Sequence, residues 1–277
     1  MKGKTNSPKF PHDIKHPVAV AHYKEKIALF YKKPNRSSEI SLYVTLSKNG
    51  TSFKDSSRRV VIFHGENEES MEKCDSFRIS MLHGEYFLTY IKKEGAKKYL
   101  IIAQSKNLLE WKVIAKTSSI DETSVIIPEQ KQDGSHNLYF GNTFIHIAHS
   151  KNLKIWSPEK THLLTPRTAY FDQAPITPMA VSETPMGIFL LYDTSTRLRD
   201  HSQIQVGGAL FSPNNPTQLI WRSETPLWRQ SNVQKNQDVE PIGAIFLKKK
   251  IILYWSQTGK GLLTLTIHHP FTKLDHK

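Results

Sequence analysis

The sequence contains very little cysteine and no long apolar segment. Cys74 is the only cysteine in 277 residues, so an internal disulfide bond is impossible and the chain suits a reducing compartment. No apolar run approaches the roughly 18–20 residues that a membrane-spanning helix needs. The basic first residues also lack the apolar core of a secretory signal. These absences predict a cytoplasmic protein that does not enter a membrane.

Acidic residues are scarce relative to basic ones. The chain has 25 Asp and Glu against 38 Lys and Arg, a formal charge of +13. Such a charge favours polyanions, including nucleic acids, as one class of partner. The lysines, however, occur in short groups along the whole chain, without an RNA-binding motif or zinc-finger spacing. We therefore predict no specific nucleic-acid partner.

Metal-ligand patterns are lacking as well. His146 and His149 are three residues apart in an expected strand, where their side chains point to opposite faces. The adjacent His268 and His269 diverge for the same reason. We predict no catalytic metal and no cofactor. Nothing in the sequence identifies an oligomeric state.

The chain does contain an internal repeat. A Ser-Lys-Asn tag, with an aromatic residue six positions after the serine, begins at Ser47, Ser105 and Ser150. Each tag follows an apolar, strand-like run. Ser-Lys-Asn is typical of a tight turn because asparagine tolerates a positive φ angle, and the aromatic side chain is then free to pack in the core. We interpret the tags as structural.

A second repeated element precedes each tag. It is a short strand, a turn and a second strand with a tyrosine near its end. These tyrosines are 49 to 62 residues apart: Tyr31, Tyr90, Tyr139, Tyr192 and Tyr254. Apolar residues recur with a period near two, which indicates strands rather than helices. Four strands repeated radially form a propeller blade. The sequence predicts an all-β fold, a five-bladed β-propeller with four-stranded antiparallel blades.

The whole chain, residues 1–277, is expected to form this single domain. Residues 1–15 are an N-terminal tail. The blades are expected at residues 16–73, 74–120, 121–170, 171–232 and 233–277.

The first strand of every blade lines the central channel of a propeller, so polar residues at the starts of these strands should meet at its mouth. The candidate catalytic residues there are Asp75, Asp193 and Glu240. The candidate substrate-binding residues are Ser76, Arg78, Asp121, Glu122, Asp172, Gln173 and Asp238. Carboxylates that face one another are costly unless they pair or have raised pKa values. Glycoside cleavage uses such a pair as acid and base.

Four stretches resemble glycoside hydrolase family 130, which contains β-mannoside phosphorylases and some β-mannosidases. They are DSFRISMLHGEYFLTY, IHIAHSKNLKIW, QVGGALFSPNNPTQLIWRSETPLW and VEPIGAIFLKKKIILYW. Each motif is loose, but their order and spacing together are specific, and they extend over most of the chain. The resemblance implies a five-bladed propeller that acts on β-mannosides, with an oligosaccharide as its substrate.

Two departures from the family pattern bear on the chemistry. The family's general acid is the aspartate of Glu-Asp-Pro-Arg. Aligned on Arg78 without a gap, Ser76 takes that place, and a one-residue bulge is needed to restore Asp75. The family's phosphorylases hold phosphate with arginine, lysine and histidine, and at the matching places this chain has Asp193, Phe140-Gly141 and Phe171-Asp172-Gln173. A site that lacks cations should repel phosphate.

We therefore expect a glycosidase, an inverting hydrolase in which Asp75 is the acid while Asp193 and Glu240 hold the attacking water as base. Inorganic phosphate would be required only by a phosphorylase. Three other functions remain open: a carbohydrate-binding propeller without catalysis, a phosphorylase that uses Arg197 or Arg199, and a five-bladed furanosidase with three carboxylates.

The carboxylates also have structural interpretations. Asp75 can pair with Arg78, Glu240 can pair with Lys235, and Asp193 can cap a turn.

Overall fold

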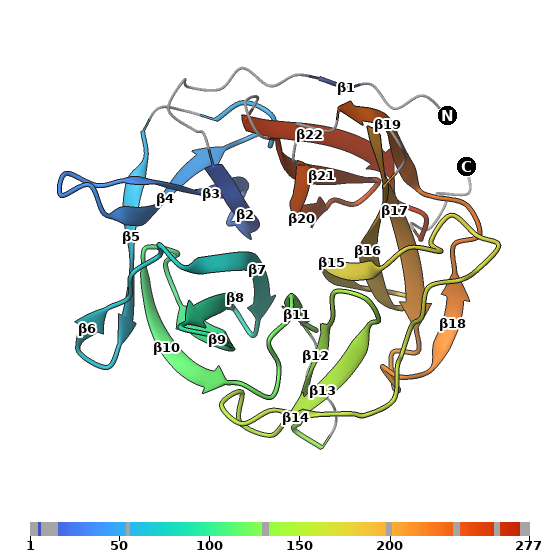
Figure 1. The fold of residues 1–277 in the computed structure, drawn as a ribbon, viewed down its shortest axis with the longest axis horizontal. Coiled ribbons are helices and arrows are strands. Elements are labelled where there is room, and N and C mark those ends of the chain that lie inside the picture. The colour runs from blue at the N-terminus through green and yellow to red at the C-terminus, as the bar shows by residue number, and fades with distance from the viewer. Residues whose placement is uncertain are drawn as a thin grey trace.

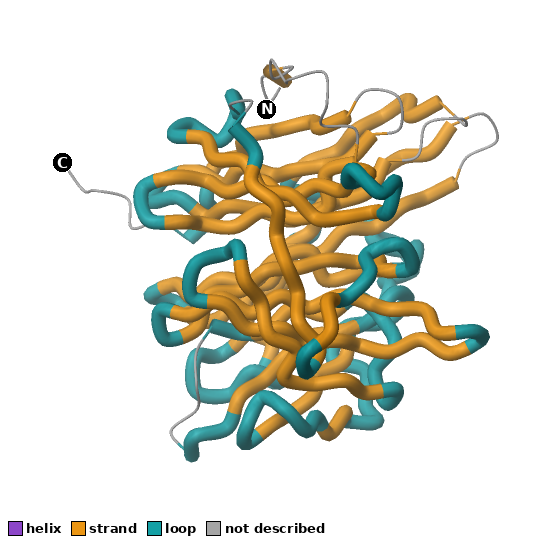
Figure 2. Tube along the Cα trace, turned by 90° about the vertical axis from the view of Figure 1, so that its left-hand side faces the viewer, coloured by secondary structure: helices purple, strands orange, loops and turns teal. Residues whose placement is uncertain are grey.

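A computed structural model describes residues 5–6, 16–53, 56–128, 133–197, 201–234, 239–257 and 261–271. Every regular element in these ranges is a β-strand, and Figure 2 shows strands joined by loops. The prediction of an all-β fold is confirmed. None of the described residues belongs to a helix that could cross a membrane.

Backbone hydrogen bonds group the strands into four sheets. The longest runs in the order β2 (His16–Tyr23), β3 (Lys26–Pro34), β4 (Ile40–Ser47), β5 (Arg58–His64), β10 (Glu110–Thr117), β9 (Lys97–Ser105), β8 (Glu85–Glu94), β7 (Cys74–Leu82), with β6 (Asn67–Glu68) on β5. The second runs β11 (Ser124–Ile126), β12 (His136–Phe140), β13 (His146–Ser150), β14 (Ser157–Pro158). The third runs β15 (Ile176–Thr184), β16 (Gly187–Arg197), β17 (His201–Phe211), β18 (Leu219–Arg222), with β19 (Trp228–Gln234) on β17. The fourth runs β1 (Thr5–Asn6), β22 (Gly261–His268), β21 (Lys250–Gln257), β20 (Val239–Phe246).

The nine-stranded sheet joins the regions expected to form the first two blades. Strand β5 pairs antiparallel with β4 at Arg58–Val60 and then parallel with β10 at Val61–Phe63. This crossing makes one continuous sheet of two groups of strands, and it places a parallel pair where purely antiparallel blades were expected.

The strands are arranged as a ring around a central axis (Figure 1). Five strands lie nearest the axis: β2, β7, β11, β15 and β20. Each contacts the next around the ring, and β20 returns to β2. A polar residue at the start of any of these inner strands is therefore close to residues that are distant in the sequence.

Apolar clusters fill the spaces between neighbouring groups of strands. Trp111 of β10 packs edge-on against Phe30 of β3, with ring centroids 6.3 Å apart. The repeated tyrosines also lie in these spaces, and all five are at most 2% exposed. Tyr139 and Tyr254 each donate a hydrogen bond to a distant backbone carbonyl, at Pro216 (2.8 Å) and Gly50 (2.9 Å). These contacts confirm the repeated aromatic residues as core.

The Ser-Lys-Asn tags form turns, as predicted. In the tag at Ser105, the serine Oγ accepts from the Leu108 N–H, and the Asn107 side chain accepts from two further backbone N–H groups. The positive φ angle falls one residue after the asparagine, at Gly50, Leu108 and Leu153. The expectation that asparagine itself takes this conformation is wrong, because its carboxamide is occupied in bonding the turn.

The expected N-terminal tail contributes a strand. In β1, Thr5 pairs with Leu265 and Asn6 with Thr264 of β22. This short strand lies at the edge of the last sheet, and the other residues of the expected tail lie outside the described ranges. The expected blade boundaries stay a prediction.

Candidate functional site

A cavity of about 610 Å³ is lined by residues of the inner strands. Six of the ten predicted site residues line it: Asp75, Ser76, Arg78, Asp121, Asp193 and Glu240. Asp75, Ser76 and Arg78 lie in β7, Glu240 in β20, Asp193 in β16 beside the inner strand β15, and Asp121 just before β11. The ring of inner strands brings these distant parts of the sequence together.

The strand that carries Asp75 contains a β-bulge. Asp75 pairs with Ile91 and Arg78 with Thr89, so two residues of β7 stand opposite one residue of β8. Ser76 has a φ angle of 57°, a region that residues other than glycine seldom occupy. The bulge required by the sequence comparison is present, and both Asp75 and Ser76 line the cavity.

The same irregularity recurs in three other inner strands. In β2, β15 and β20 the register shifts directly after a proline: Pro17, Pro178 and Pro241. Proline has no N–H to donate, so it fits an edge strand, and bulges re-aim the side chains beside them. The inner edge of the ring is therefore built to direct side chains towards the axis.

Asp75 forms an ion pair on the surface of the cavity. Its Oδ2 lies 3.1 Å from Lys93 Nζ, and both side chains are about half exposed (49% and 51%). Its ion-pair partner is thus Lys93 and not Arg78, the partner considered from the sequence. Exposed pairs of this kind open readily, since they contribute only about 0–1 kcal/mol.

Arg78 is buried within the cavity wall, with 6% of its surface exposed. Its Nη1 donates to the Phe77 carbonyl at 2.8 Å, while its Nε has no hydrogen-bond partner. Burial lowers the pKa of the guanidinium to about 10, although the nearby Asp193 and Glu240 carboxylates oppose this. An unpaired buried donor lowers the free energy of unfolding by about 1–3 kcal/mol, so Arg78 destabilises the fold.

Asp193 lies within β16, directly opposite Thr177 of β15. Its Oδ1 is sealed from solvent and has no hydrogen-bond partner. Burial raises the pKa of the carboxyl to about 7, and the charge of Arg78 only partly offsets this. The idea that Asp193 caps a turn is wrong, because it sits in a continuous strand. A carboxyl that titrates near neutrality can give or take a proton.

Glu240 completes the group of carboxylates. It is exposed at the start of β20, opposite Ser256, and both residues line the same cavity.

Lys32 is a cavity residue that the sequence analysis missed. Its Nζ donates to the Cys74 carbonyl and lies 5.0 Å from the centre of the Phe77 ring. Burial lowers the pKa of this ammonium, while Cys74, Asp75 and Glu240 raise it. Lys98 also lines the cavity. The expectation of a site without cations is therefore wrong. The available signal was the position of Lys32 directly after Tyr31, the tyrosine near the end of the first repeated hairpin.

Asp172 lies elsewhere and is fully buried. Its Oδ1 accepts from Arg167 Nε at 3.0 Å, and its Oδ2 accepts from Arg222 Nη2 at 2.6 Å and from the Tyr192 hydroxyl at 2.7 Å. The structure therefore places Asp172 in an internal ion-pair cluster and not among the cavity residues.

Gln173 and Glu122 are likewise absent from the residues that line the cavity. Gln173 is exposed. Burial, and then the charge of Asp121, raise the pKa of Glu122. Asp238, Lys235, Arg199 and the side chain of Arg197 lie outside the described residues.

No three histidine, cysteine, aspartate or glutamate side chains in the described part of the chain are grouped as metal ligands. The absence of a catalytic metal stays a prediction.

A ring of β-sheets around a central cavity is the arrangement of a β-propeller. The chain belongs to glycoside hydrolase family 130. The family model that matches residues 15–256 describes a beta-1,4-mannooligosaccharide phosphorylase.

Solved structures share this fold. One of them comes from the GH130 family of mannoside phosphorylases and is described as a glycoside hydrolase that targets β-1,2-mannosidic linkages in Candida mannan. It is 20% identical to this chain, with 97% of each chain covered and a TM-score of 0.75. A glycosyl hydrolase from Bacteroides ovatus is 19% identical, with 97% of each chain covered and a TM-score of 0.74. A β-1,2-mannobiose phosphorylase from Listeria innocua is 16% identical over 91% of this chain and 88% of that one, with a TM-score of 0.70. No protein of curated function matches the sequence.

Proposed function

We propose that the protein is an inverting glycoside hydrolase that cleaves β-mannosides at the cavity of the inner strands. The observation that carries this proposal is Asp193, a carboxyl whose pKa of about 7 suits acid–base work, in a cavity that also holds Asp75 and Glu240. We interpret the fold as a five-bladed propeller. Support comes from the closed ring of inner strands and from apolar clusters between successive groups of strands.

The proposed reaction uses the three carboxylates in different roles. Asp193 and Glu240 hold a water molecule, and one of them takes its proton as the water oxygen bonds to the anomeric carbon. Asp75 gives its proton to the glycosidic oxygen as the bond from that oxygen to the anomeric carbon breaks. Before this step the ion pair of Asp75 with Lys93 opens, and the half-exposed Asp75 takes up from solvent the proton that it then gives. Arg78, in the cavity wall, favours the ionised form of the base Asp193.

Phosphorolysis is the second candidate function. The cavity contains Lys32, Arg78 and Lys98, which could together attract an oxyanion. Two of these cations already bond backbone carbonyls, Lys32 to Cys74 and Arg78 to Phe77. Four carboxylates line the same cavity, and their charge opposes a phosphate ion. This balance favours water as the nucleophile.

The test is to incubate the protein with β-1,2- and β-1,4-mannobiose, with and without inorganic phosphate, and to follow the products by proton NMR. Hydrolysis with inversion gives α-mannose first and does not need phosphate. Formation of mannose 1-phosphate only when phosphate is present would favour the second candidate. Binding without turnover would favour a carbohydrate-binding propeller.

Variants link the activity to the cavity. Asp193→Ala, Glu240→Ala and Asp75→Asn should each reduce turnover at least about a hundredfold while the circular dichroism spectrum is retained. Gln173→Ala is the control, because this exposed side chain does not line the cavity. Unchanged activity in both alanine variants would refute the proposed mechanism.

A further inference from the structure

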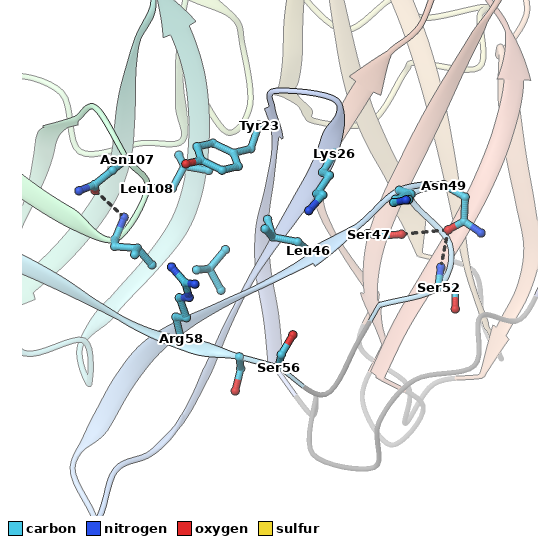
Figure 3. A pocket seen from close by; sticks show the side chains of 14 residues that line it. Tyr23, Lys26, Leu46, Ser47, Asn49, Ser52, Ser56, Arg58, Asn107 and Leu108 are labelled. Carbon is cyan, nitrogen blue, oxygen red and sulfur yellow. Dashed lines mark hydrogen bonds between the residues drawn. The ribbon is translucent and has the colours of Figure 1, made fainter.

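A second cavity, of about 840 Å³, lies between the first two groups of strands (Figure 3). It shares no lining residue with the cavity that contains Asp75, Asp193 and Glu240. Its volume is within the range of about 300–1,000 Å³ that small-molecule sites occupy. The proposed catalytic mechanism makes no use of it.

The cavity lies where β5 begins. The pairing of β4 with β5 ends at Val44 and Arg58, and β5 crosses to β10 only at its other end, from Val61. Beyond Val44, the last residues of β4 have no partner on β5, and they line the cavity together with the turn at residues 107–109. The cavity therefore lies at the open end of this pairing.

The inner surface of the cavity is apolar. Val44 and Leu46 of β4 line it together with Leu108 and Leu109 of the facing turn. Tyr23, which packs on Tyr86 with ring centroids 6.2 Å apart, adds an aromatic surface. Such a surface suits an apolar or flat ligand body.

The rim carries positive charge. Lys26, Lys48 and Arg58 line the cavity, and Figure 3 shows Lys26 and Arg58 extending towards the same space. No ion pair joins any of the three to a described carboxylate. In contrast, the neighbouring Arg59 is paired with Glu68. None of the described residues that line the cavity is acidic.

The two asparagines of the rim add further donors. Asn49 and Asn107 use their carboxamide oxygens to accept backbone N–H groups of their turns. Their NH₂ groups are then the part that can bond a ligand. The cations and the asparagine NH₂ groups can only donate, while the hydroxyls of Ser52, Ser56 and Ser57 can donate or accept. The cavity therefore offers several donors to an oxyanion.

We propose that this cavity binds a small organic oxyanion, a phosphate or sulfate monoester whose body rests on the apolar surface. Arg58 and Lys26 hold the charged group, and Tyr23 with Leu46 contacts the body. The site is separate from the mannoside site and does not depend on its chemistry.

The experiment measures binding of three probes by isothermal titration calorimetry: 4-nitrophenyl phosphate, mannose 6-phosphate and inorganic phosphate. At least one monoester should bind about tenfold more tightly than inorganic phosphate. Which monoester binds more tightly shows whether the cavity prefers an aryl group or a sugar as the body of the ligand. Arg58→Gln should weaken that binding about tenfold or more, as expected for the loss of a charge-assisted hydrogen bond. Arg59→Gln is the matched control, because Arg59 is paired with Glu68 and does not line the cavity.

The titrations are repeated with saturating β-1,2-mannobiose to separate the two cavities, with Asp193→Asn as a second check. Binding that persists, and that Arg58→Gln alone weakens, supports the proposal. The proposal is overturned if neither monoester binds, or if both arginine variants have the same effect. It is also overturned if mannobiose or the Asp193→Asn substitution abolishes binding. Failure of mannoside cleavage would leave this result unaffected.

Discussion

Arg78 and Asp193 line the same cavity, and each keeps a polar atom that is sealed from solvent and has no hydrogen-bond partner. Each charge favours the ionised form of the other, yet burial dominates the pKa of both groups. Unpaired buried atoms of this kind reduce stability, and in native proteins they call for a functional explanation. The relationship leads to three of the four predictions below.

Replacing Arg78 should raise stability and remove function. Arg78→Met fills a similar volume and removes an unpaired buried donor, so we expect the free energy of unfolding to rise by about 1–3 kcal/mol below about pH 7, where Asp193 is protonated and needs no counter-charge. Mannobiose binding, measured by calorimetry, should be lost, and Arg78→Lys should restore part of it. A less stable methionine variant that still binds the sugar would identify Arg78 as a structural residue instead.

Asp193 should make stability depend on pH. Because its pKa is about 7 in the folded protein and 3.8 ordinarily, the folded state binds this proton more tightly. The resulting stabilisation is complete below about pH 4 and is lost as the pH rises to about 7, by up to about 4 kcal/mol. Asp193→Asn should lack this loss in urea unfolding at pH 4 to 8. The exposed Glu240→Gln should retain it, and parallel curves for wild type and Asp193→Asn would contradict the assignment.

The pH dependence of turnover should identify the role of Asp193. As the base, it works only when ionised, so kcat/KM should rise with pH and level off above about 7. As an acid, it would give a fall through the same range. Initial rates on β-1,2-mannobiose in phosphate-free buffers at pH 5 to 9 distinguish the two slopes.

Asp172 should be essential for stability and not for chemistry. Asp172→Ala leaves Arg167 and Arg222 with buried, unpaired charge, so the free energy of unfolding should fall by about 3–5 kcal/mol. Gln173→Ala, at the exposed neighbouring position, should change it by less than about 0.5 kcal/mol. Urea titration measures both. Equal effects of the two substitutions would show that the Asp172 ion pairs contribute nothing.

The repeat pattern predicted the β-structure well, because alternation and turn chemistry are local properties. The Ser-Lys-Asn tags are turns with a buried aromatic residue. Strands β7 and β20 begin within one residue of Asp75 and Glu240, whereas Asp121 and Asp172 precede the first residues of β11 and β15. The sequence did not predict which strands pair where one group of strands meets the next. The crossing of β5 to β10 and the pairing of β1 with β22 depend on partners distant in the sequence.

The candidate site was predicted in part. The sequence placed Asp75, Arg78 and Glu240 at the starts of inner strands, and these residues do line one cavity. Asp172 had the same sequence context but is held in the interior by two arginines. The sequence does not single out Lys32 among the lysine groups of the chain, and only the ring of strands brings it beside Cys74.

The sequence by itself determined the strands, the turns and the resemblance to family 130, because side-chain alternation and turn residues act over a few positions. The tertiary structure decided which polar residues share a cavity and which form internal ion pairs. It also raised the pKa of Asp193 to about 7. These properties depend on burial and on neighbours from other strands, and a linear pattern of residue types contains neither.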